Sequence, residues 1–137
     1  MGMYFKSEGV ALKNIAEYFL KQSSEEREHA LKLMEYQVKR GGAIKLIDIK
    51  APANNTWGTA ADSLMEALKL EKRVNKQLLD LHTLGETHGD KDFCDFLEEN
   101  YLNEQVESIK EISDLMTNAQ RCGEGLGEFM FDKEAFS

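Results

Sequence analysis

Residues 22–33 read QSSEEREHALKL and interrupt an otherwise ordinary amphipathic helix pattern. Residues three and four apart share one face of a helix. Here that face consists of Leu12, Ile15, Phe19, Gln22, Glu26, His29 and Leu33. Its two ends are apolar, but an amide, a carboxylate and an imidazole occupy its centre. Burial of an ionisable group costs several kcal/mol unless the group is paired, neutralised or bound to a metal. The stretch therefore predicts a helix that carries a polar site.

The composition of the 137-residue chain excludes several classes of protein. A formal net charge of -8 argues against a nucleic-acid partner, because phosphate binding needs a basic face. No apolar run reaches the length of a membrane-spanning helix, so we expect no membrane partner. The two cysteines form no disulfide framework, and the start MGMYFKSEG lacks the apolar core of a secretory signal. We therefore expect a cytoplasmic protein.

A single proline in the whole chain indicates an all-α fold, because proline is excluded from helix interiors. The long connection 43–57 holds that proline and predicts a crossover that travels along a helical bundle. Gly41-Gly42 would end the helix before it, and Thr59-x-x-Asp62 would cap the helix after it. We expect one domain over residues 1–137, with helices at about 10–40, 59–84, 91–121 and 125–134.

Polar residues also interrupt the apolar faces of the second and third long helices. The second face reads Glu66, Leu70, Val74, Leu78 and Leu81, and the third reads Cys94, Glu98, Tyr101, Gln105, Ser108, Ile112, Leu115 and Ala119. Two interpretations remain open on spacing alone. The polar groups could form a hydrogen-bonded network, or they could bind a metal. Carboxylates with one imidazole and no thiolate suit iron or manganese better than structural zinc.

Five separated motifs resemble eukaryotic ferritin of the heavy, ferroxidase-bearing type. The resemblance covers nearly the whole chain from Tyr4 to Lys133, with the motifs in the same order. The motifs are SSEEREHALKLMEYQVKRGG (23–42), DIKAP (48–52), LEKRVNKQLLDLH (70–82), FCDFLEENYLNEQV (93–106) and GEFMFDK (127–133). The resemblance implies a ferritin-like helical bundle that assembles into a large shell, possibly shared with other ferritin chains. It further implies that Fe(II) is oxidised by dioxygen at a dinuclear site and stored as a ferric oxide mineral.

By matching motifs, the resemblance implies a role for each candidate residue. Glu26 would bridge the two irons and His29 would bind one of them. Glu66 would bind the second iron, with Gln105 near it. Tyr101 and Glu25 would lie just outside the iron ligands, and Glu25 and Glu28 would help the mineral to nucleate.

The resemblance also implies a cation channel lined by Asp95 and Glu98, with His82 and Cys94 beside them. Several copies of two acids around one axis would attract and pass cations. An alternative is that Asp95 and Glu98 simply complement the positive end of their own helix.

Ferritins have a further long helix before the position of Tyr4, and it supplies a glutamate to the first iron. This chain has only MGMYF at that place, so we expect the first bundle helix to be largely missing. An alternative function follows, in which the chain is a storage or shell subunit with an incomplete ferroxidase site. A further alternative is a helical scaffold with a buried polar network.

Overall fold

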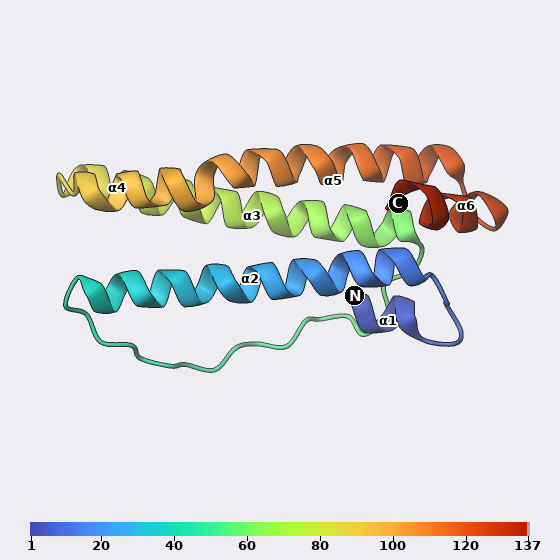
Figure 1. The fold of residues 1–137 in the computed structure, drawn as a ribbon, viewed down its shortest axis with the longest axis horizontal. Coiled ribbons are helices and arrows are strands. Elements are labelled where there is room, and N and C mark those ends of the chain that lie inside the picture. Colours follow the sequence, from blue (N-terminus) through green and yellow to red (C-terminus); the bar gives the residue numbers. More distant parts are fainter. Residues whose placement is uncertain (137) are drawn as a thin grey trace. The chain divides into compact units, whose positions relative to one another are not determined.

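The computed structural model describes residues 1–136, and these residues contain helices but no strand (Figure 1). The predicted all-α class is therefore confirmed. In chain order the elements are α1 (Gly2–Lys6), α2 (Lys13–Lys39), α3 (Ala60–Thr87), α4 (Lys91–Leu97), the π-helix η1 (Glu98–Leu102), α5 (Asn103–Cys122) and α6 (Leu126–Ala135).

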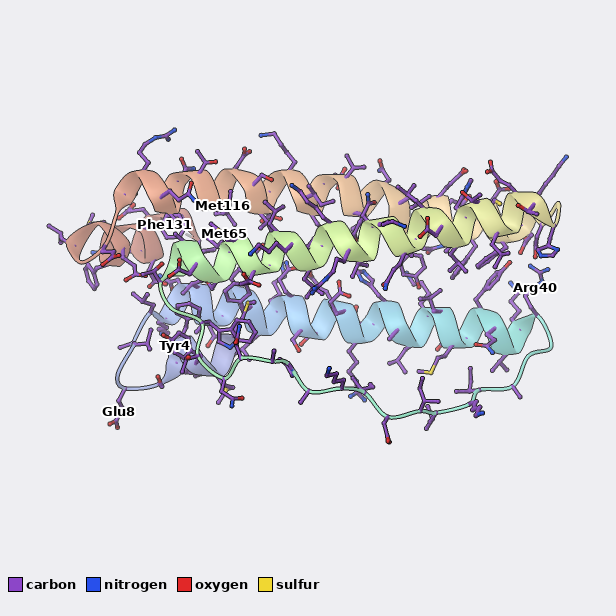
Figure 2. The ribbon with its side chains drawn as sticks, turned by 180° about the vertical axis from the view of Figure 1, so that it is seen from behind. Tyr4, Glu8, Arg40, Met65, Met116 and Phe131 are labelled. Atoms are coloured by element: carbon purple, nitrogen blue, oxygen red, sulfur yellow. The ribbon has the colours of Figure 1, made fainter. Side chains whose placement is uncertain are left out.

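Two features differ from the helices expected from the sequence. The first long helix begins at Lys13, because residues 7–12 form a turn after α1. In this turn Ala11 has a φ of 54°, and the amides of Val10 and Ala11 both donate to the carbonyl of Ser7. Glu8 projects from the same turn (Figure 2). The third long helix is interrupted by η1, which the sequence pattern did not predict.

The described residues form two compact units, and the first contains Met1–Trp57 together with the residues from Asp132 onward. Its core lies where α1 packs against α2. Phe5 and Ile15 are fully buried, and the Phe5 ring stacks on Phe19 with 5.9 Å between the ring centroids. The connection after α2 returns along this helix as an extended segment (Figure 1), and Ile49 within it is 93% exposed.

Asp132 supplies the cap that the start of α2 lacks. The N-cap residue Leu12 makes no side-chain hydrogen bond to the helix. Instead, the amide of Ile15 donates to Asp132 Oδ1 at 2.7 Å, and the amide of Asn14 donates to Asp132 Oδ2 at 3.3 Å. The Asn14 side chain in turn donates to the Asp132 carbonyl at 3.0 Å. A buried carboxylate thus satisfies two of the amide groups that every helix start leaves unpaired.

The second unit contains Gly58–Phe131, and its core lies where α3 packs against α4, η1 and α5. Leu64 and Leu97 are fully buried there. The predicted cap of α3 is present as a reciprocal pair, because Asp62 N donates to Thr59 Oγ1 and Thr59 N donates to Asp62 Oδ2. The bond from the Thr59 amide lowers the pKa of the Asp62 carboxyl below its ordinary value. Glu128 adds a second cap by accepting from Ala60 N at 2.6 Å.

Candidate functional site

Glu26 and His29 lie one turn apart on α2, and their side chains meet. His29 Nδ1 is 3.3 Å from Glu26 Oε1. The side chain of Glu26 is 53% exposed and that of His29 is 23% exposed. The pair is therefore reachable from solvent rather than sealed in a core. It offers one nitrogen and two oxygen donors within a single helical turn, which is a donor set suited to iron.

The second pair of candidate groups joins α5 to α3, and it differs from the expectation. Gln105 is buried, and its Nε2 donates to Glu71 Oε2 at 2.5 Å and to the Glu71 carbonyl at 3.0 Å. Glu66, expected beside Gln105, instead forms an ion pair with Lys69 at 2.8 Å. Five residues along a helix turn the side chain by about 140°. Glu66 therefore leaves α3 on a different side from Glu71.

The sequence contained a signal for Glu71 that the expected face passed over. The predicted face of α3 advances by four residues at every step, through Glu66, Leu70, Val74 and Leu78, so its side chains drift around the helix. A face that alternates steps of four and three keeps its side chains on one side of the helix, and it contains Ala67, Glu71, Val74 and Leu78. Ala67 and Leu78 are both buried. Glu71 thus lies on the packed face of α3, where Gln105 reaches it.

Three further candidates lie near these two pairs along the chain. Tyr101 is buried within η1 and packs edge-on against Phe96, with 5.6 Å between ring centroids. π-Helical turns occur often at functional sites. Glu25 forms an ion pair with Lys21 at 3.6 Å. Glu28 is exposed, as a residue that meets a growing mineral would have to be.

The candidate channel residues form a second cluster, within the second unit. His82 Nε2 is 2.7 Å from Glu98 Oε1, and Cys94 Sγ donates to the carbonyl of His82 at 3.6 Å. Burial, followed by the negative charges of Glu86 and Glu98, raises the pKa of the Cys94 thiol. A raised pKa keeps this thiol protonated at neutral pH, so it is a poor metal ligand there.

Acidic residues other than Asp95 and Glu98 complement the positive N-terminal end of α4. Asp90 Oδ1 accepts from Phe93 N at 3.1 Å, and Asp92 is the acid of the first turn. Asp95 lies beyond that turn and is exposed, and Glu98 lies in η1. The field of a helix end falls off within one turn. Helix capping therefore does not account for Asp95 and Glu98.

Two kinds of feature are absent from residues 1–136. No group of three or more His, Cys, Asp or Glu side chains in this range is arranged to hold a metal ion. No helix in the same range combines the length and apolarity needed to cross a membrane.

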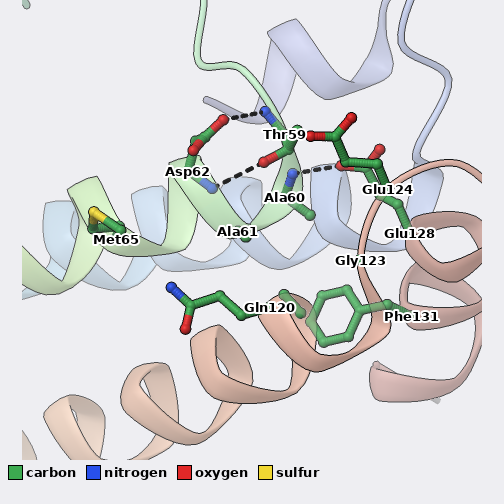
Figure 3. A pocket seen from close by; sticks show the side chains of 11 residues that line it. Thr59, Ala60, Ala61, Asp62, Met65, Gln120, Gly123, Glu124, Glu128 and Phe131 are labelled. Carbon is green, nitrogen blue, oxygen red and sulfur yellow. Dashed lines mark hydrogen bonds between the residues drawn. The ribbon is translucent and has the colours of Figure 1, made fainter.

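A pocket in the second unit has none of the predicted site residues in its lining (Figure 3). It has a volume of about 250 Å³ and lies between the start of α3, the end of α5 and α6. Phe131 and Ala119 form apolar parts of its wall, and Gln120, Glu124 and Glu128 form polar parts. One oxygen of Glu128 already caps α3, as the dashed line to Ala60 shows (Figure 3).

Long helices that carry Glu-x-x-His and carboxylate–amide pairs are typical of the metal-binding helical proteins of the ferritin-like class. Comparison with known proteins agrees, because the ferritin-like domain family matches residues 1–122. The chain is 55% identical to the soma ferritin of Lymnaea stagnalis over 137 residues, which are 100% of this chain and 79% of that protein. It is 50% identical to the middle subunit of ferritin from Aquarana catesbeiana over 138 residues, 98% of this chain and 78% of that subunit. It is 48% identical to the ferritin-1 heavy chain of Schistosoma mansoni over 134 residues, 98% of this chain and 78% of that chain.

The chain therefore belongs to the ferritin family, and the resemblance seen in its motifs is confirmed. Membership of this family supports a function in iron storage.

Proposed function

We propose that this chain oxidises Fe(II) with dioxygen and stores the ferric product as a mineral within a multi-subunit shell. Iron is the substrate and the cargo, and each Fe(II) gives up one electron to dioxygen. The protein contributes ligands of suitable type and charge rather than acid–base chemistry. Glu26 and His29 would hold iron on α2, and Glu71, oriented by Gln105 from α5, would hold iron on α3.

The single observation that supports this assignment most is the hydrogen bonding of Gln105 to Glu71. A buried amide that donates to both the carboxylate and the carbonyl of one residue fixes that residue's position. Outer groups that orient a ligating carboxylate commonly strengthen a metal site. Glu71 is therefore the better choice than Glu66 for the second iron, since Glu66 is paired with Lys69 on another side of α3.

The accessory roles follow from charge and exposure. Asp95 and Glu98 would attract Fe(II) to the shell, with His82 holding Glu98 in place at 2.7 Å. Glu25 and Glu28 would bind ferric iron at the start of mineral growth. Both cysteines are free, which suits a reducing compartment and supports a cytoplasmic location.

A second candidate function is a storage or shell subunit without ferroxidase activity. It is favoured by the finding that residues 1–136 contain no group of three or more His, Cys, Asp or Glu side chains arranged to hold a metal. The two functions differ in a direct measurement, the rate of dioxygen consumption after Fe(II) is added to the purified chain. Ferroxidase activity predicts fast consumption that His29→Ala abolishes. A rate equal to that of protein-free buffer would instead establish the storage subunit.

A further inference from the structure

Four basic residues form a stripe on the exposed face of α3. Lys69, Lys72, Arg73 and Lys76 are spaced i, i+3, i+4 and i+7, so they share one side of the helix. All four are exposed. The buried residues Ala67 and Leu78 lie on the opposite side, where α3 packs against α5. We call these four residues the basic stripe.

The charge of the basic stripe is only partly balanced by its neighbours. Lys69 pairs with Glu66 at 2.8 Å, and Lys76 pairs with Asp80 at 2.7 Å. Within residues 1–136, the side chains of Lys72 and Arg73 make no ion pair or hydrogen bond. The middle of the stripe is therefore positive while each end is neutralised, in a chain whose formal net charge is -8.

Half-exposed leucines flank this positive centre. Leu70 is 47% exposed and Leu79 is 48% exposed, and they lie to either side of the stripe on the helix surface. An arginine beside exposed apolar side chains is the composition expected of a protein-binding surface. We propose that the basic stripe docks an acidic helical segment of a partner protein, with carboxylates between Lys72 and Arg73 and apolar side chains against the two leucines.

The size and charge pattern of the stripe favour this occupant over a nucleic acid or an anionic membrane. From Lys69 to Lys76 the helix rises only about 10 Å. A phosphate chain that continued along α3 would meet Glu66 at one end and Asp80 at the other. Anionic lipid and nucleic acid both need wider basic surfaces than this stripe offers. A short acidic helix needs only the centre of the stripe and stays clear of Glu66 and Asp80.

The test measures the binding of a fluorescently labelled synthetic helix to the purified chain by anisotropy. The peptide carries glutamates at the centre of one face and leucines on either side of them. We expect saturable binding that weakens as salt is raised, because exposed charges are screened. Lys72→Glu with Arg73→Glu should weaken binding about tenfold or more, since two attractions become repulsions.

A matched variant separates local contact from overall charge. Lys32→Glu with Lys39→Glu makes the same change in net charge at two exposed lysines of α2 and should leave peptide binding within about twofold. Circular dichroism confirms that both variants are folded. Equal losses in the two variants, or no binding by the unaltered chain, would overturn the proposal. So would tighter binding to duplex DNA or to phosphatidylserine vesicles than to the peptide.

Discussion

Removal of the Asp132 carboxylate should destabilise the chain by about 3 kcal/mol, because within residues 1–136 it is the only side chain that caps the start of α2. A hydrogen bond from an amide to a buried charged group contributes about 1.5–3 kcal/mol. The bond from Ile15 N is short at 2.7 Å and counts for about 2 kcal/mol, whereas the bond from Asn14 N is long at 3.3 Å and counts for about 1 kcal/mol. The bond from the Asn14 side chain goes to the Asp132 carbonyl, and Asp132→Ala leaves it intact.

The assay is urea unfolding followed by circular dichroism at fixed protein concentration, since assembly would shift apparent stability. Asp132→Asn keeps one oxygen acceptor without the charge and should lose about half as much. Asp114→Ala is the matched control, because that carboxylate is exposed and forms a surface ion pair with Lys110, so its loss should cost about 0.5 kcal/mol. A loss below about 0.5 kcal/mol for Asp132→Ala would refute the capping role.

Three further predictions concern the caps, the turns and the candidate channel. The pKa of the Asp62 carboxyl is lowered on folding, so its stabilising effect is present above the usual pKa of an aspartate and is lost as pH falls through the lowered value. Asp62→Asn should therefore remove this part of the pH dependence of stability in thermal unfolding scans. An unchanged pH profile would contradict the capping role of Asp62. Ala11→Gly should stabilise the chain by about 0.5–1 kcal/mol in urea unfolding, because Ala11 has a φ of 54° that favours glycine, and a destabilised variant would show that the turn carries no strain. Asp95→Asn with Glu98→Gln should slow Fe(II) uptake by the assembled protein without changing its size in gel filtration, and an unchanged uptake rate would exclude a channel role.

The helices were predictable from the sequence because their signals are local. Thr59 caps α3 together with Asp62, only three residues further on. The absence of proline from the long helices is likewise visible in each short stretch of the sequence. The π-helix η1 was not predictable from such signals. It adds a residue to one turn without any proline or glycine to mark the place, and the stepping of polar and apolar residues continues through it.

The candidate site was predictable only in part. Glu26 and His29 are neighbours on one helix, so their contact follows from their spacing. The neighbour of Gln105 depends on which side of α3 faces α5, and 34 residues separate Gln105 from Glu71. The buried face of α3 must therefore be known before Glu71 can be preferred to Glu66 as the neighbour of Gln105. A face drawn in steps of four residues puts Glu66 there instead of Glu71. Asp132 is separated from Ile15, whose amide it accepts from, by 117 residues along the sequence, so no local pattern predicts this cap.

We propose that Glu71, held by Gln105, takes part in Fe(II) oxidation. The most direct measurement compares dioxygen consumption after Fe(II) addition in Glu71→Gln and Glu66→Gln, two variants that make the same change five residues apart on α3. We expect Glu71→Gln to reduce the rate to near that of protein-free buffer, while Glu66→Gln should stay close to the unaltered chain. The reverse result, or equal losses in both variants, would contradict this expectation.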